Sequence, residues 1–209
     1  MPQITKINTV RHAKTYYSMD HRYAGSIDVP LSDQGIQDAR DMAKQLSEIK
    51  FDAVITSTLN RTIKTAELLT SRNGHFEQNE LCNERNFGAM EGLTWNEVQN
   101  LDPPVLFIEV GNDLHSVNPR GGEAFEDVWR RARKFHRYLF NEHKGSNILI
   151  VSHGVFLQLF HGLLRGLSCI ESLSKPYPST LDLTTFHFSD NDLVFEETIK
   201  FAKVEEKSF

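Results

Sequence analysis

Short strand-like runs and longer helix-like stretches of apolar residues alternate along the chain. Segments 4–10, 53–56 and 147–151 have the length and the β-branched content of buried strands. A weaker strand is expected at 76–81, and residues 183–188 and 193–199 have the pattern of a hairpin that turns at Asp190-Asn191. Six strands separated by helical stretches are typical of a sheet that helices cover.

Apolar residues recur at helical spacing between these strands. Ser32 is a good N-cap for a helix, and the apolar face of this helix consists of Ile36, Ala39, Ala43 and Leu46. Helices are also expected at 60–69, 94–101, 125–139 and 155–164, the last being almost entirely apolar. We therefore predict an α/β fold, a three-layer sandwich whose mainly parallel central sheet carries helices on both faces.

The pattern weakens between the two halves of the sequence. Residues 103–122 contain three prolines and several glycine, asparagine and aspartate residues, which are typical of loops. We predict one domain over residues 1–209, with a lid or insertion at 84–122.

Composition and charge exclude several classes of protein. Hydrophobic residues make up 39% and charged residues 24% of the 209-residue chain, which argues against disorder. A net charge of −5 gives no basic surface for nucleic acid. Polar residues interrupt the longest apolar stretch, 148–164, so no membrane span is expected, and the first residues do not resemble a signal peptide. With only two cysteines, expected to be reduced, the sequence favours a cytoplasmic protein and leaves a homodimer open.

Two of the predicted strands end in a histidine. Arg11 and His12 follow the strand at 4–10, and His153 follows the strand at 147–151. Ligands bind at the carboxyl ends of strands in an open α/β sheet, so these side chains can meet. Arg61, just after the strand at 53–56, adds a second guanidinium that can bind two phosphate oxygens. We expect His12 to attack phosphorus, Arg11 and Arg61 to hold the phosphate, and His153 to donate to it when protonated.

Glu84 is the candidate proton donor for the leaving group, because a departing alkoxide needs a proton. His12, Glu84 and His153 also have the ligand types of a zinc site. Two flanking arginines oppose that alternative, and we expect neither a metal nor a cofactor. Each of these residues alone is more often structural than catalytic.

Ordered stretches within residues 3–165 are similar to the motifs of the histidine phosphatase superfamily, the phosphoglycerate-mutase-like enzymes. These stretches are Arg11-His12-Ala13-Lys14-Thr15, Arg22 to Gly35, Ser57 to Glu67, Leu81 to Gly92, and the pair Pro119 to Glu123 and Val151 to Gly154. Ala13 replaces the usual glycine, and strain would follow only if this position needed a positive φ.

The resemblance implies the phosphoglycerate-mutase-like fold and a phosphohistidine mechanism without metal. It implies His12 as the phosphate acceptor, Glu84 as the proton donor, and Arg11, Arg61 and His153 as the phosphate clamp. Further pocket residues carried over from the family are Ser18, Ala24, Gly25 and Gly154, and Glu123 would be a supporting residue.

Three functions remain open at this point. A phosphomonoester hydrolase acting on a small phosphorylated metabolite is favoured, because no arginine or lysine lies between Arg85 and Arg120, where the mutases carry paired arginines. A cofactor-dependent phosphoglycerate mutase and a non-catalytic phospholigand-binding domain are the alternatives. Arg130 and Arg131 are interpreted as a solvated helix face. An apolar rim for the substrate is expected from Phe87, Met90, Trp95, Phe107 and Ile108.

Overall fold

A six-stranded sheet lies at the centre of the computed structural model, which describes residues 3–71, 76–111, 113–117 and 119–201. The strands are β1 (Ile4–Arg11), β2 (Ala53–Thr56), β3 (Glu77–Gln78), β6 (Asn147–Ser152), β7 (Leu183–Ser189) and β8 (Asp192–Ile199). Their order is β3-β2-β6-β1-β7-β8. Strands β3, β2, β6 and β1 are parallel, whereas β7 and β8 pair antiparallel. The predicted mainly parallel sheet is confirmed.

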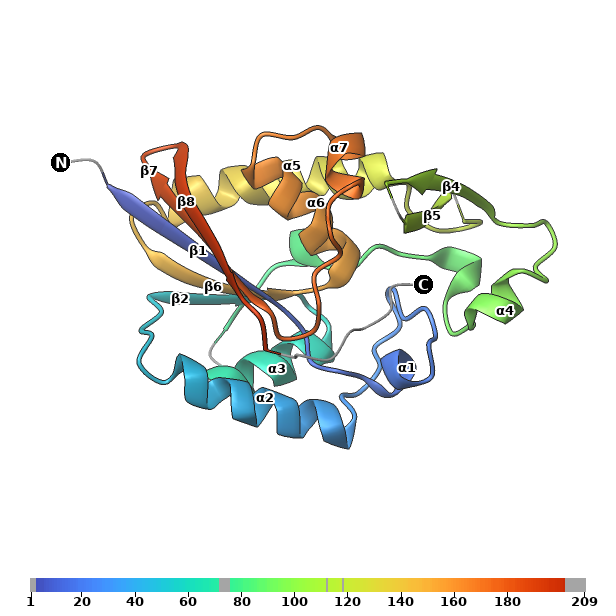
Figure 1. The fold of residues 1–209 in the computed structure, drawn as a ribbon, viewed down its shortest axis with the longest axis horizontal. Helices are drawn as coiled ribbons and strands as arrows, with labels where there is room; N and C mark the ends of the chain where they lie inside the picture. The colour runs from blue at the N-terminus through green and yellow to red at the C-terminus, as the bar shows by residue number, and fades with distance from the viewer. Residues whose placement is uncertain (1–2, 72–75, 112, 118, 202–209) are drawn as a thin grey trace.

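Helices cover both faces of this sheet (Figure 1). Helices α2 (Asp33–Leu46) and α3 (Asn60–Thr70) lie on one face, and α5 (Phe125–Glu142) and α6 (Gly154–Leu164) lie on the other. Along β6, Ile148 and Ile150 pack into the core beside α5 and α6, while Leu149 and Val151 pack into the core beside α2 and α3. All four are fully buried, and each contributes about 1.5–3 kcal/mol relative to an exposed side chain. This burial on both faces explains the unbroken apolar run in the sequence.

The start of α2 is fixed by local chemistry. The Ser32 hydroxyl accepts a hydrogen bond from the Gly35 N–H, as its N-cap role predicts. A β-carbon at Gly35 would lie 2.1 Å from the carbonyl oxygen of Lys14, so only glycine allows this approach. The helix therefore packs directly against the loop that follows His12.

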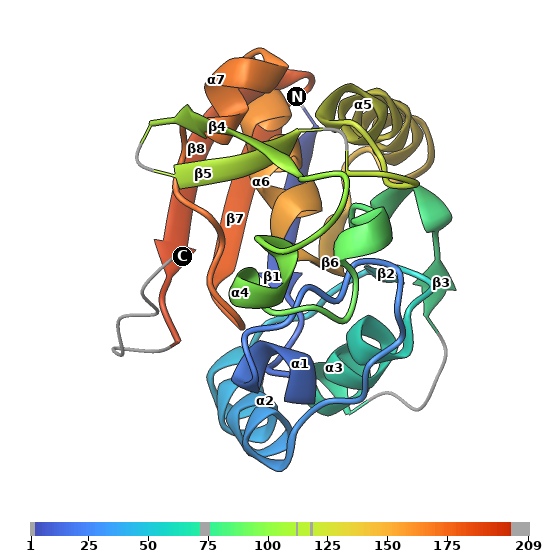
Figure 2. The ribbon, with the colours of Figure 1, turned by 90° about the vertical axis from the view of Figure 1, so that its right-hand side faces the viewer.

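The segment predicted as an irregular insertion contains more order than expected. It holds η2 (Gly88–Met90), α4 (Trp95–Val98) and a separate antiparallel pair, β4 (Leu106–Val110) and β5 (Asp113–Val117). Figures 1 and 2 place α4 and this pair at the end of the molecule toward which β1 runs. The role of the segment as a lid stays a prediction.

Three further short helices were not predicted: α1 (Tyr16–Met19), η1 (Glu80–Cys82) and α7 (Cys169–Leu173). Each spans a single turn or little more, so it gives no apolar periodicity in the sequence. None of the helices in the described part of the chain is long and apolar enough to cross a membrane.

Candidate active site

The two histidines meet at the carboxyl ends of neighbouring strands. Strands β1 and β6 pair in parallel, with Arg11 opposite Ser152, so the residues that follow them lie side by side. The rings of His12 and His153 are 5.2 Å apart between centroids, edge to face. The convergence expected from the sequence is therefore present.

His12 is held in one tautomer by the backbone. Its Nδ1 lies 2.8 Å from the carbonyl oxygen of Ala13, and because a carbonyl only accepts, Nδ1 carries the proton. Burial, followed by the charges of Arg61 and Arg11, holds the pKa of His12 well below its ordinary value. The ring is thus neutral near pH 7, with the lone pair on Nε2 free for attack.

His153 is also neutral before an anion binds, and the donor role expected of its protonated form stays a prediction. Arg61 Nε donates to His153 Nδ1 over 3.2 Å, so the ring proton lies on Nε2, 2.7 Å from the hydroxyl oxygen of Ser57. Burial lowers the pKa of His153 well below its ordinary value, and Arg61 adds to the shift. Before an anion binds, burial and the nearby charges of Arg61 and Arg11 disfavour the protonated form of this ring.

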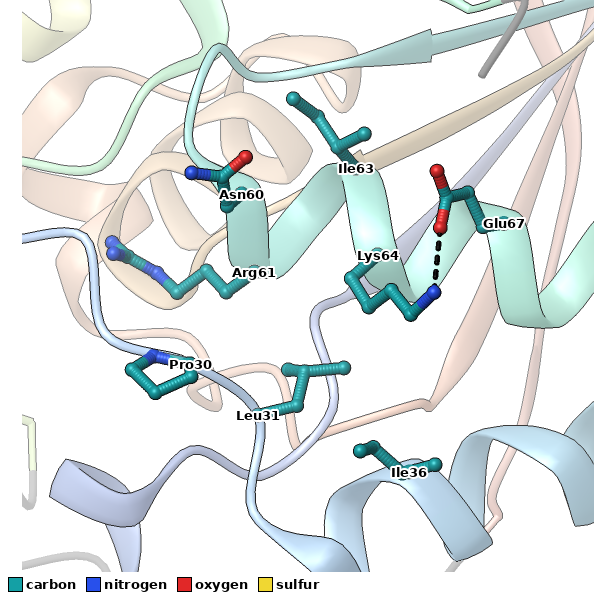
Figure 3. Close-up of a pocket in the computed structure, with 8 residues that line it drawn as sticks. All are labelled: Pro30, Leu31, Ile36, Asn60, Arg61, Ile63, Lys64 and Glu67. Carbon is teal, nitrogen blue, oxygen red and sulfur yellow. Dashed lines mark hydrogen bonds and ion pairs between the residues drawn. The ribbon is translucent and has the colours of Figure 1, made fainter. Parts of the chain in front are cut away.

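Arg61 connects this histidine to the loop after α1. Its Nη2 donates to the Gly25 carbonyl over 2.6 Å and its Nη1 to the Ile27 carbonyl over 2.7 Å. In Figure 3 its side chain extends away from the Lys64–Glu67 ion pair, which lies along the same hollow between α2 and α3. Neutral carbonyls orient the guanidinium without cancelling its charge.

Arg11 is oriented in a similar way. Its Nη1 donates to the Pro178 carbonyl over 3.1 Å, and its buried Nε has no hydrogen-bond partner. Within the described residues, neither Arg11 nor Arg61 forms an ion pair with a carboxylate. Two guanidinium groups beside two neutral histidines give a local positive site on an acidic protein, and such a site binds an anion.

Glu84 is anchored at the start of α6. Its Oε2 accepts from the Val155 N–H and its Oε1 from the Phe156 N–H, both over 3.2 Å, and Oε1 also accepts from the Arg85 N–H. The first N–H groups of a helix have no partner within the helix, so a carboxylate there is stabilised. Because α6 begins directly after His153, this anchoring brings Glu84 to the histidine pair.

Arg131 holds the segment that carries Glu84, which contradicts its interpretation as part of a solvated face, whereas Arg130 does face solvent. Its guanidinium donates to the backbone carbonyls of Leu81, Asn83 and Glu84 and forms an ion pair with Glu123. The helical period of α5 places Arg131 beside the buried row, whereas Arg130 faces solvent. Glu123 lies before the N-cap of α5, so no helical spacing in the sequence indicated its ion pair with Arg131.

The remaining predicted site residues differ in their contacts. Gly25 contributes its carbonyl to Arg61, with Ala24 beside it, and Gly154 is the first residue of α6. The Ser18 hydroxyl is engaged in capping α1, since it bonds to the backbone of Thr15. Ala13 does not adopt a positive φ, so alanine at this position carries no strain.

The expected apolar rim is wrong for Met90 and Phe87, which belong to the interior, whereas Ile108 is exposed and Trp95 and Phe107 are half-buried. Met90 is fully buried in the core, Phe87 is 9% exposed, and Trp95 packs edge to face on Phe107. Beside Glu84 lies a pocket that seven polar or charged residues and two leucines line, although most of the surface it exposes is apolar. Its lining is Ser26, Leu59, Glu80, Leu81, Asn83, Glu84, Asn86, Glu123 and Arg131.

Comparison with known proteins agrees with this geometry. The family model of the histidine phosphatase superfamily (branch 1) matches residues 7–198. The chain belongs to this superfamily. It is 31% identical over 152 residues to phosphoglycerate mutase-like protein 4 of Arabidopsis thaliana, covering 71% of this chain and 66% of that protein.

A second relative and a solved structure extend the likeness over most of the chain. Fructose-2,6-bisphosphatase TIGAR B of Danio rerio is 30% identical over 218 residues, covering 83% of each protein. The structure of Bacillus stearothermophilus YhfR superposes with a TM-score of 0.78 at 28% identity, covering 91% of this chain and 94% of that one. The phosphoglycerate-mutase-like fold predicted from the motifs is thereby confirmed.

Proposed function

We propose that this member of the superfamily is a metal-independent phosphomonoester hydrolase that forms a phosphohistidine at His12. The supporting observation is the neutral His12, whose Nδ1 donates to the Ala13 carbonyl, beside two guanidinium groups that form no ion pair with a carboxylate within the described residues. A neutral imidazole is the nucleophilic form, and fixed cations stabilise the phosphoryl group as charge moves during transfer.

The reaction then proceeds in two steps. In the first, His12 Nε2 forms a bond to phosphorus, the bond from phosphorus to the ester oxygen breaks, and Glu84 gives the departing oxygen a proton. In the second, water attacks phosphorus, Glu84 takes a proton from that water, and the nitrogen–phosphorus bond breaks to release phosphate. Burial and the nearby cations keep His153 neutral, and a bound phosphate dianion favours its charged form. A proton gained at Nδ1 would displace the Arg61 Nε donor and give His153 an N–H for a phosphate oxygen.

The substrate is a small phosphorylated metabolite with a polar leaving group. The pocket beside Glu84 contains two amides, Asn83 and Asn86, and two further carboxylates, Glu80 and Glu123. These groups match hydroxyl or amino substituents better than an aryl or alkyl chain. A phosphorylated sugar, as the name of the zebrafish relative indicates for that protein, fits this chemistry.

Phosphoglycerate mutase activity is the second candidate, favoured by the mutase-like relative. A mutase must hold a substrate carboxylate in two orientations, which calls for additional cations near the phosphate site. No arginine or lysine lies between Arg85 and Arg120, and Arg85 itself is buried under the β4–β5 pair, where it bonds to Ser116. Hydrolysis is therefore preferred.

Hydrolysis of p-nitrophenyl phosphate with and without EDTA tests the proposal, together with trapping of an acid-labile phosphoenzyme. We expect turnover in EDTA, loss of both turnover and the adduct in His12→Ala, and neither loss in His136→Ala, a histidine on α5. Interconversion of 2- and 3-phosphoglycerate would establish the mutase, and phosphate binding without turnover would establish a binding domain. A cytoplasmic location and a homodimer stay predictions.

A further inference from the structure

Tyr177 lies over the phosphate site, in a segment that the family motifs in residues 3–165 do not reach. The Arg11 Cζ is 5.0 Å from the centre of the Tyr177 ring, within the range of a cation–π interaction. The next residue, Pro178, supplies the carbonyl that accepts from Arg11 Nη1. Two consecutive residues of one loop therefore orient the same guanidinium.

The tyrosine also reaches the second half of the site. A β-carbon at Gly154 would lie 1.9 Å from the Tyr177 hydroxyl oxygen, so the absence of a side chain at Gly154 makes room for the phenol. Gly154 directly follows His153. Tyr177 thus spans from the arginine at the end of β1 to the first residue of α6, the two elements that carry the histidine pair.

The same loop is fastened to β1 by its backbone. Thr180 pairs with Arg11 in an isolated parallel bridge, and the Leu181 N–H donates to the Arg11 carbonyl over 3.0 Å. Leu181 adopts a positive φ of 63°, an uncommon conformation for leucine that directs the chain back along the strand. Residues 177–181 therefore contact both the backbone and the side chain of Arg11.

We propose that Tyr177 is a positioning residue, whose ring holds the Arg11 guanidinium in the orientation that binds the substrate phosphate. This inference rests on the proposed phosphate site and identifies how one of its cations is oriented. The face of an aromatic ring attracts the guanidinium but takes up none of the N–H groups that lie in the guanidinium plane. These N–H groups of Arg11 therefore stay available to an anion. A carboxylate in the place of Tyr177 would orient Arg11 equally well but would cancel its charge.

Isothermal titration with inorganic phosphate and with orthovanadate tests this inference without any need for turnover. We expect Tyr177→Leu to raise the dissociation constant of both anions by about 3- to 30-fold, the range that cation–π energies imply. Tyr177→Phe keeps the ring and stays within about twofold of wild type. Tyr138→Leu removes a tyrosine on α5 that bonds to Glu77, away from the histidine pair, and is the matched control with unchanged affinity.

A double-mutant cycle separates positioning from a general structural effect. In an Arg11→Gln background, Tyr177→Leu is expected to change orthovanadate affinity by less than about twofold, because the guanidinium that it orients is gone. An equal loss in both backgrounds, or wild-type affinity in Tyr177→Leu, would overturn the inference. If Tyr177→Leu does not fold, Tyr177→Met is judged by the same criteria.

The outcome is distinguishable from failure of the proposed hydrolysis. Weaker anion binding in Tyr177→Leu with no turnover in the wild type would keep the positioning role and reject the hydrolase. Turnover in the wild type, together with unchanged anion binding in Tyr177→Leu, would keep the hydrolase and reject the positioning role.

Discussion

At the scale of single residues, the hydrogen bonds of His153 assign a role to Ser57. Because Arg61 occupies Nδ1, the Nε2 proton of His153 points to the Ser57 hydroxyl, which in turn lies 2.8 Å from the Thr62 hydroxyl. Both His153 and Ser57 are fully buried, so no water replaces a lost partner. Ser57 appears in a family motif, but only the structure shows what its hydroxyl contacts.

Replacing Ser57 with alanine leaves the His153 Nε2 proton without an acceptor. We expect the free energy of unfolding to fall by about 1–3 kcal/mol, the penalty for one unsatisfied buried donor. Arg61 Nε still donates to Nδ1, so we expect the proton to stay on Nε2, which nitrogen-15 chemical shifts of the imidazole detect. Ser47→Ala, an exposed serine at the end of α2, is the control. Wild-type stability in Ser57→Ala, or a proton found on Nδ1, would contradict the assigned network.

Replacing Glu84 with glutamine tests its role as proton donor. The amide oxygen can still accept from the Arg85 and Phe156 N–H groups, but the amide nitrogen replaces Oε2 and cannot accept from Val155. We expect the free energy of unfolding to fall by about 1–3 kcal/mol for this one lost acceptor, while the fold survives and the amide gives up no proton. We expect kcat for an alkyl phosphate to fall about 100- to 10,000-fold. The loss for p-nitrophenyl phosphate is expected to be smaller, since p-nitrophenolate leaves without protonation. Equal losses for both substrates would show that Glu84 serves some other function.

At the scale of helices and strands, the position of Glu84, the proposed proton donor, depends on helix α5. Arg131 donates to the backbone carbonyls of Leu81, Asn83 and Glu84 and pairs with Glu123, and its side chain is only 15% exposed. Arg131→Ala is expected to lower the free energy of unfolding by about 1–3 kcal/mol, because these carbonyls lose their donor and Glu123 loses its ion pair. It is also expected to reduce kcat, since residues 81–84 lose their support. Urea unfolding and steady-state kinetics measure the two effects.

The neighbouring arginine gives a matched control for this prediction. Arg130 has the same chemistry, but it is largely exposed and pairs only with Asp127 one turn away. Arg130→Ala is expected to leave both stability and kcat close to wild type. Similar losses in the two variants would show that helix α5, rather than the Arg131 contacts, is what matters.

The helices and strands also show which parts of the fold could be predicted from the sequence and which could not. Long periodic segments such as 125–139 and buried strands such as 147–151 were predicted because their apolar pattern records which faces are covered. The β4–β5 pair was missed because nearby prolines and Gly111 hid the alternation of Leu106 and Ile108. The roles of Arg131 and Tyr177 were missed because contacts across distant segments leave no local pattern.

At the scale of the whole molecule, the fold keeps several histidines uncharged. Burial lowers the pKa of His12 and His153 well below its ordinary value and that of His161 to about 3. In the unfolded chain all three regain a pKa near 6.5. Between that value and their folded pKa values, the unfolded state binds more protons than the native state. The free energy of unfolding is therefore fully present above pH 6.5 and falls as the pH drops below it.

We expect acidification from pH 7 to pH 5 to lower the free energy of unfolding by about 2 kcal/mol for His161, with further losses in the same direction from His12 and His153. His115, His136 and His187, whose pKa values burial also lowers, add to the loss in the same window. Urea unfolding followed by circular dichroism measures the slope. His161→Gln is expected to reduce the slope by one proton, whereas Ser47→Ala, which removes no titratable group, leaves it unchanged. A slope that is flat from pH 7 to pH 5 would mean that these rings are already charged in the native state, and His12 would then lack the lone pair that attack on phosphorus requires.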